Sequence, residues 1–150
     1  MNGEKMKKVV RLSFAIYLVL VLFGFANAQY NALTDEQEEA TAVLESFLNA
    51  QTAGDTETIK ESLGGDLLEK RLSLLNNPDY ASFLYNMYKD AFFEILNYKS
   101  IGKESIQIDV KINLNENESQ RMRYLLIKKS TPQDSTPRFR IYSQTELTSK

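Results

Sequence analysis

The 150 residues include no cysteine and no histidine. A chain without cysteine has no disulfide, no thiol nucleophile, no thiolate metal site and no acceptor for the lipid of a bacterial lipoprotein. A chain without histidine lacks the commonest general base and the commonest metal ligand. Any catalysis would have to use carboxylates, Tyr, Lys, Arg or hydroxyl groups. We therefore predict no catalytic residue, no metal site and no cofactor from the sequence.

The long apolar run near the N-terminus, residues 12–26, has the surroundings of a secretory signal. A basic stretch precedes it, and the tripeptide at residues 26–28, Ala-Asn-Ala, matches an A-x-A cleavage site. The run is about 15 residues long, whereas an unstrained membrane helix needs roughly 20. We predict a signal peptide over residues 1–28, cleavage near Ala28, and a periplasmic or secreted mature protein without a membrane span.

Removal of this segment leaves residues 29–150, which are enough for a single domain with one hydrophobic core. This mature part carries 14 Lys and Arg against 19 Asp and Glu, a net charge of −5. The charge is uneven, because residues 29–69 hold 1 basic and 10 acidic residues, whereas residues 70–150 hold 13 basic and 9 acidic ones. An acidic domain argues against a general nucleic-acid binder, which would normally be basic.

A first helix is predicted over residues 34–54. Thr34 and Gln37 have the spacing of a capping box, and Gly54 supplies a stop. Acidic residues crowd the first turn, where the helix dipole favours negative charge. The apolar residues recur with a helical period: Ala40, Val43, Leu44, Phe47 and Leu48.

Three shorter helices are predicted between Gly54 and Asp90. The first of them ends at Gly64-Gly65, and Asp66 and Asp79 have the positions of N-caps for the other two. The last helix presents a set of apolar residues: Tyr80, Phe83, Leu84, Met87, Tyr88 and Ala91.

Strands fill the rest of the chain. Residues 92–101 fit either a continued helix or a strand, and we predict a strand from about Phe93 because a short turn follows at Gly102. Residues 106–114 alternate strictly between aliphatic and polar, which is typical of a half-buried strand. A third strand is predicted over residues 120–129. A polar loop with two prolines then leads to a last strand, residues 138–145.

Helices followed by a four-stranded antiparallel meander indicate an α+β fold with the helices packed on one sheet. The phrase at residues 47–55, the short helices, the long strands and the closing Phe139-Arg140-Ile141 together resemble the nuclear transport factor 2-like superfamily, in particular its small exported bacterial members of unassigned function. The resemblance implies a curved sheet wrapped around a long helix in a cone, often with a pocket at its mouth and often dimeric. It implies no activity, because this cone hosts isomerases, dehydratases, ligand carriers and interaction domains.

Tyrosines are the candidate ligand-binding residues. Eight occur in the chain, and those on the last helix and the sheet could line a pocket for a small apolar ligand. The alternative is that they are core residues with a solvated hydroxyl. The tyrosines that we assign to the ligand site are Tyr80, Tyr88, Tyr98 and Tyr124.

An isomerase-like site would need a buried Asp or Glu opposite a proton donor. The aliphatic positions of the second strand leave only Asp90 and Glu94 as candidates, so an enzyme is the less favoured alternative. Basic residues form the other candidate site, because strand parity places several of them on the face opposite the aliphatic rows, with Asp109 as the one nearby acid. Either this face is an ordinary solvated surface, or it binds an acidic protein partner. Its residues are Lys111, Arg121, Arg123, Arg138 and Arg140.

The sequence therefore predicts an exported, non-enzymatic binding or protein-interaction module. The alternative is a small-molecule carrier or an isomerase or dehydratase that uses the pocket of the cone.

Overall fold

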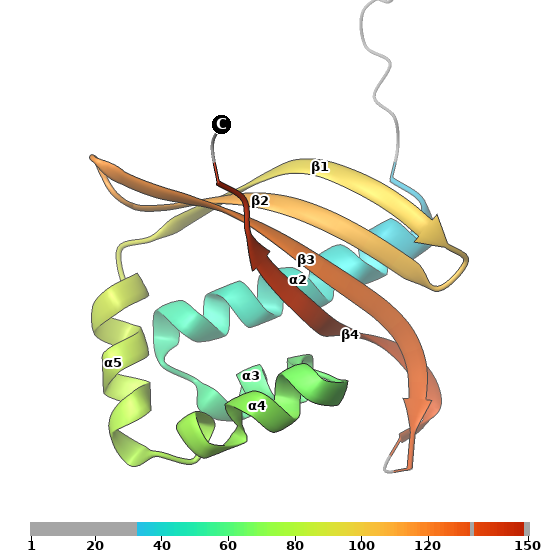
Figure 1. Cartoon of the computed structure of the whole chain (residues 1–150), viewed down its shortest axis with the longest axis horizontal. Coiled ribbons are helices and arrows are strands. Elements are labelled where there is room, and N and C mark those ends of the chain that lie inside the picture. The colour runs from blue at the N-terminus through green and yellow to red at the C-terminus, as the bar shows by residue number, and fades with distance from the viewer. Residues whose placement is uncertain (1–32, 133, 149–150) are drawn as a thin grey trace, which may run out of the picture. The chain divides into compact units, whose positions relative to one another are not determined.

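The computed structural model describes residues 33–132 and 134–148. The predicted signal peptide and cleavage site lie outside these residues. No helix in the described part is long and apolar enough to cross a membrane. Helices precede strands along the chain (Figure 1), which confirms the predicted α+β class. The elements are α2 (Asp35–Ala53), α3 (Thr56–Ser62), α4 (Gly65–Leu75), α5 (Pro78–Tyr88), β1 (Phe92–Gly102), β2 (Ser105–Asn115), β3 (Glu118–Thr131) and β4 (Asp134–Glu146).

Both ends of α2 are those predicted. The backbone N–H of Gln37 donates to the Thr34 hydroxyl at 3.2 Å, and the N–H of Thr34 donates to the Gln37 side chain at 3.0 Å, which completes a capping box. Gly54 ends the helix with a φ of 69°. A side chain there would also meet the carbonyl oxygen of Ala81 at 2.4 Å from its Cβ. Glycine is therefore required at this position both for its backbone angle and for space.

The N-caps of α4 and α5 differ from the prediction. Gly64 caps α4, and Asp66 lies within the first turn. Asn77 caps α5, and its side chain accepts a hydrogen bond of 3.0 Å from the N–H of Asp79. The reason in α5 is Pro78, whose fixed φ and missing N–H suit the first helical position, so the cap lies at Asn77, two residues before the predicted Asp79.

The strands form one antiparallel sheet in the order β1-β2-β3-β4. Residues 92–101, which fitted a helix or a strand, belong to β1, as predicted. The alternating residues of β2 bury their aliphatic side chains on the inner face, but Asp109 and Asn113 on the outer face are buried as well. β2 thus has buried residues on both faces, and it lies between β1 and β3 in the sheet.

The last two strands are longer than predicted. β3 covers residues 118–131, and β4 begins at Asp134 and not at Arg138. The predicted polar loop is therefore a tight hairpin, and Pro137 lies within a strand. Proline is tolerated there because β4 is an edge strand, in which a backbone N–H need not pair.

The outer edge of β4 is covered by the segment that joins α3 to α4. Leu63 forms a parallel bridge with Ile141, and the N–H of Gly64 donates to the carbonyl of Ile141 at 3.0 Å. A Cβ at Gly64 would lie 2.8 Å from the ring of Tyr142. The missing side chain lets this crossing segment lie against the sheet.

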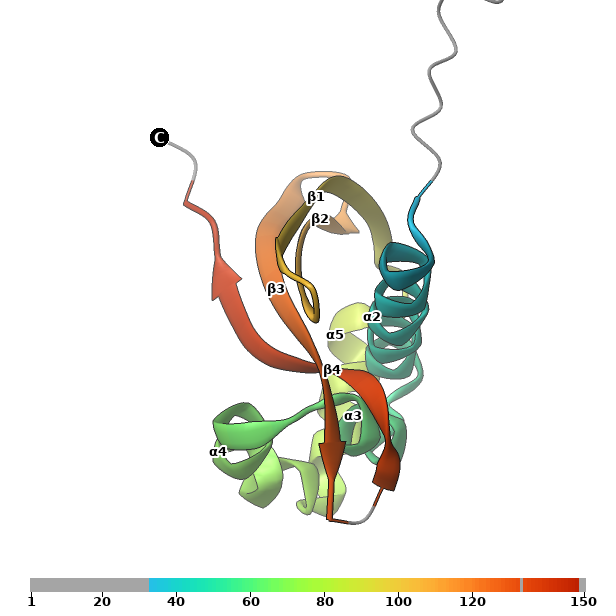
Figure 2. The ribbon, with the colours of Figure 1, turned by 90° about the vertical axis from the view of Figure 1, so that its right-hand side faces the viewer.

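The hydrophobic core lies between α2 and the inner face of the sheet, which curves towards this helix (Figure 2). Phe47, in the middle of α2, is fully buried. Its ring meets Tyr124 of β3 edge to face, with 5.9 Å between ring centroids and an interplanar angle of 67°. The predicted apolar face of α2 is confirmed, since Ala40, Leu44, Phe47 and Leu48 are all buried.

Replacing Phe47 by alanine should remove this central contact. Truncation of a buried phenylalanine typically costs about 3–5 kcal/mol of unfolding free energy, against a total of roughly 5–15 kcal/mol for a domain. Urea denaturation of Phe47→Ala measures the loss. Ser46→Ala, at the neighbouring exposed position of the same helix, is the control and should change stability little. A loss below about 1 kcal/mol in Phe47→Ala, within the range of ordinary surface changes, would contradict the role given to α2.

Candidate functional site

One cluster of the predicted basic residues lies on the outer face of β2 and β3. Asp109 stands opposite Arg123 in the antiparallel register. The Arg123 guanidinium donates through Nε and Nη2 to the two carboxylate oxygens of Asp109, each at 2.8 Å. These hydrogen bonds raise the pKa of Arg123. The charge of Arg123 is therefore compensated within the fold.

Lys111 and Arg121 occupy the next outer-face position along the same two strands. They are directly opposite each other in the register, and neither forms an ion pair with another residue in the part of the chain that the structure describes. Both border an open hollow of about 680 Å³. The N–H of Leu147 donates to the carbonyl of Arg121 at 2.7 Å and holds the end of the chain beside this hollow. The other lining residues are Ser119, Gln120, Glu146, Leu147 and Thr148.

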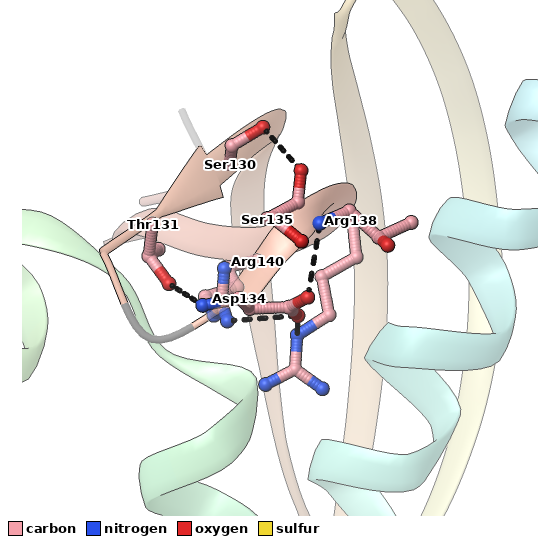
Figure 3. Close-up of polar contacts among 7 residues, drawn as sticks. Ser130, Thr131, Asp134, Ser135, Arg138 and Arg140 are labelled. Carbon is pink, nitrogen blue, oxygen red and sulfur yellow. Dashed lines mark hydrogen bonds and ion pairs between the residues drawn. The ribbon is translucent and has the colours of Figure 1, made fainter.

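The remaining two basic residues lie at the β3–β4 hairpin (Figure 3). The carboxylate of Asp134 accepts from Arg138 Nε at 2.9 Å and lies 3.6 Å from Arg140 Nη2. The N–H of Asp134 donates to the Thr131 hydroxyl at 3.2 Å. One acid thus holds both arginines at the opposite end of β4 from Glu146.

The prediction of one exposed basic face is therefore corrected. The side chain of Arg140 is only 9% exposed. The crossing segment covers it, because a Cβ on Gly64 would lie 3.2 Å from the Cβ of Arg140. Arg138 borders a different hollow, of about 310 Å³, between α2, α3 and β4, together with Glu39 and Glu61. Strand parity places a side chain on a face but does not reveal what covers that face.

Three of the four predicted tyrosines lie near one another. Tyr124 is fully buried, and its hydroxyl has no hydrogen-bond partner among the described residues. Burial raises the pKa of Tyr124, the neighbouring Tyr88 raises it further, and Arg71 opposes the shift. Burial likewise raises the pKa of Tyr88, with Tyr80 contributing and Arg71 again opposing. Tyr98 stands apart, since its hydroxyl accepts a hydrogen bond of 3.2 Å from Thr41.

Arg71 and Gln144 are polar residues near these tyrosines that the sequence analysis did not find. Arg71 of α4 donates from Nη2 to the Gln144 side chain at 2.7 Å. Gln144 is the cross-strand neighbour of Tyr124. A correct prediction of the β3–β4 register would therefore have placed Gln144 beside this tyrosine. None of the four tyrosines lines the hollows described at the basic residues. Their role in binding a ligand therefore stays a prediction.

The acidic candidates for a catalytic base do not reach this interior. Asp90 is exposed in the turn after α5, and Glu94 is exposed on β1. Glu94 is the cross-strand neighbour of Lys111 on the outer face. No group of three or more acids among the described residues has the arrangement of a metal site.

Comparisons with known proteins add a likeness in structure. No family model matches the chain, and no curated protein is significantly similar to it in sequence. Among solved structures it is similar to a ketosteroid isomerase-like protein from Erwinia carotovora atroseptica SCRI1043, with a TM-score of 0.43 and 9% identity. The likeness covers 78% of this chain and 100% of that one. The description as ketosteroid isomerase-like applies to that protein alone. The α+β class of the present chain follows from its own helices and strands.

The same charge reversal at two arginines should have opposite consequences. Arg140→Glu places a carboxylate beside Asp134 in a covered position, and disruption of a buried ion pair typically costs about 3–5 kcal/mol. Arg121→Glu is exposed and sets an acid opposite Lys111, which should leave stability unchanged or raise it by roughly 0.2–1 kcal/mol. Thermal and urea unfolding of the two variants measure the difference. Equal stability would contradict the burial of Arg140.

Proposed function

We propose that this protein is an exported, non-enzymatic binding module of the cell envelope, and that an acidic protein partner binds at Lys111 and Arg121. The observation that carries the proposal is the placement of these two cations directly opposite each other at the rim of the hollow of about 680 Å³. Carboxylates of a partner could enter the hollow and meet both charges, together with the hydroxyl and amide groups of Ser119 and Gln120.

The like-charge contact between β2 and β3 favours this interpretation over an ordinary solvated face, although Lys111 also stands opposite Glu94 of β1. Like charges directly opposite each other destabilise an antiparallel pair, by roughly 0.2–1 kcal/mol on the scale of such contacts. Three other arginines of the sheet form ion pairs within the fold: Arg123 with Asp109, and Arg138 and Arg140 with Asp134. The charges of Lys111 and Arg121 form no such pair within the described residues. A cost of this kind is understandable if the charges act on another molecule.

Two further arguments support the proposal. Export is supported by the basic, apolar and Ala-Asn-Ala pattern of residues 1–28. The non-enzymatic role is supported by the exposure of Asp90 and Glu94, which leaves the interior tyrosines without a carboxylate base from these positions. We also propose membership of the nuclear transport factor 2-like superfamily, on the order of the elements and the phrase at residues 47–55.

The double variant Lys111→Gln/Arg121→Gln tests the site. We expect it to bind a fluorescein-labelled glutamate-rich peptide at least several-fold more weakly, and to be as stable as the unaltered protein or slightly more stable, because the like-charge contact is removed. Fluorescence anisotropy measures binding, and it should also weaken with added salt. Lys89→Gln/Lys103→Gln, at two exposed lysines, is the control of equal charge. If both double variants bind equally, the attraction is only that of net charge and the site is wrong.

A second candidate function is the transport or binding of a small apolar ligand in the interior. The observation that favours it is the Tyr124 hydroxyl, which is buried without a partner near Tyr88 and Arg71. An unpaired buried hydroxyl costs about 1–3 kcal/mol. A ligand with an acceptor group would satisfy it, and an acidic ligand would also interact favourably with Arg71.

Tyr124→Phe distinguishes this second function. Removal of an unpaired hydroxyl should leave the unfolding free energy unchanged or raise it by up to about 1 kcal/mol. Binding of anilinonaphthalene sulfonate, an apolar probe with an acidic group, should become weaker if the interior binds ligands. Tyr85→Phe, at an exposed tyrosine of α5, serves as the control. A marked loss of stability in Tyr124→Phe would mean that the hydroxyl already has a partner within the protein.

A further inference from the structure

The two edges of the sheet are unlike each other. The edge of β4 is covered by the Leu63–Gly64 crossing and contains Pro137. The edge of β1 has no backbone partner among the described residues, since β1 pairs only with β2. An open edge of 11 residues is a template for pairing with another strand.

Large apolar side chains gather on this open strand. Phe92, Leu96 and Ile101 are 63%, 42% and 55% exposed. The side chains of Phe93, Ile95 and Tyr98 point the other way and pack against the core. β1 therefore exposes large apolar side chains beside Glu94, Asn97 and Lys99, and packs other apolar side chains against the core. Exposed apolar residues on an open edge favour pairing with another strand.

A bulge in the middle of β1 makes its two halves mirror each other. The register with β2 shifts between Ile95 and Asn97, so Leu96 is the extra residue. Without a bulge, Ile95 and Tyr98 would lie on opposite faces, because successive side chains alternate. With it, both face the core, and Leu96 and Asn97 both face outward. Over residues 93–100 the in-and-out order of the strand consequently reads the same in both directions from the 96–97 bond. A second register shift, between Ser100 and Gly102, lies beyond this stretch.

We propose that two copies of this chain pair through β1, antiparallel, about a two-fold axis at the 96–97 bond. In this register Phe93 stands opposite Ser100 of the second copy, Ile95 opposite Tyr98, and Leu96 opposite Asn97, so that every pair matches in face. Glu94 stands opposite Lys99, and Phe92 stands opposite Ile101. The ion pair and the apolar pair each occur twice, as a two-fold contact requires.

Neighbouring registers lose this agreement. A shift of one residue sets Glu94 opposite Tyr98, which joins an outward to an inward side chain. A shift of two sets Glu94 opposite Asn97 or Ile101, which removes the ion pair and mismatches the faces at the bulge. The register about the 96–97 bond is favoured because it alone among these satisfies charge and face together.

The surroundings of the edge leave room for the second strand. A hollow of about 230 Å³ lies between α2 and β1, lined by Glu45, Leu48, Asn49, Phe93 and Ile95. The second copy would bring its own Tyr98 beside Ile95, at the border of this hollow. The other edge of each sheet is crossed at Ile141 and contains Pro137, and both features oppose pairing of further copies there.

Charge reversal tests the pairing in the purified full chain. We expect the unaltered protein to form a concentration-dependent dimer in sedimentation velocity. Lys99→Glu should weaken the dimer roughly tenfold, because two attractions become repulsions, and Glu94→Lys/Lys99→Glu should restore it. Lys99 is the residue to change first, since its neighbour within the sheet is the neutral Gln107. Lys103→Glu, in the turn after β1, is the control and should leave the dimer unchanged.

A single cysteine gives a measurement that does not depend on charge. The chain has no cysteine, so Asn97→Cys would introduce one beside the two-fold axis, where its copy lies within disulfide range. Mild oxidation should give a cross-linked dimer, whereas Lys103→Cys should not. A monomer at all concentrations, a dimer unaffected by Lys99→Glu, a double variant that fails to restore pairing, or equal cross-linking at both cysteines would each overturn the proposal.

Discussion

The packing of α2 on the inner face of the sheet is the contact on which the rest of the structure depends. Phe47 and Tyr124 meet at its centre, and both are fully buried. Around them the ion pair of Glu39 with Lys128, at 2.5 Å, joins the acidic helix to the basic half of the chain. This hydrogen-bonded contact raises the pKa of Lys128. The uneven distribution of charge along the sequence thus contributes to the attraction between α2 and the sheet, and it also sets the charge of the surface.

The crossing at Leu63 and Gly64 decides which polar groups are available. It covers Arg140, and it leads the chain into α4, which carries Arg71 to Gln144 on the last strand. The arginines therefore fall into two groups. Those at the hairpin and near the tyrosines have partners within the fold, whereas Arg121 extends beside Lys111 towards the open hollow. The proposed binding surface is therefore smaller than the number of basic residues suggests.

The sequence was a good guide where local rules decide the outcome. The capping box at Thr34, the stop at Gly54 and the alternation in β2 are properties of a few neighbouring residues, and each is found in the structure. The burial of Arg140 could not be predicted in the same way, because the covering segment is distant in the chain. The bulge at Leu96 was equally hidden, since a register shift is a relation between two strands. Sequence patterns therefore located the elements, but long-range contacts determined the candidate site.

The bridge between Leu63 and Ile141 also has a consequence for the order in which the domain folds. The four strands are joined by short turns and can pair with their neighbours as they form, whereas this bridge closes a loop that contains nearly the whole sheet. Closing a long loop costs more chain entropy than closing a hairpin, so contacts of this kind slow folding. We therefore expect the meander to form before its last edge is covered. Until that edge is covered, the partly folded chain has two open strand edges that can pair with other molecules. The folded protein has one among its described residues, at β1.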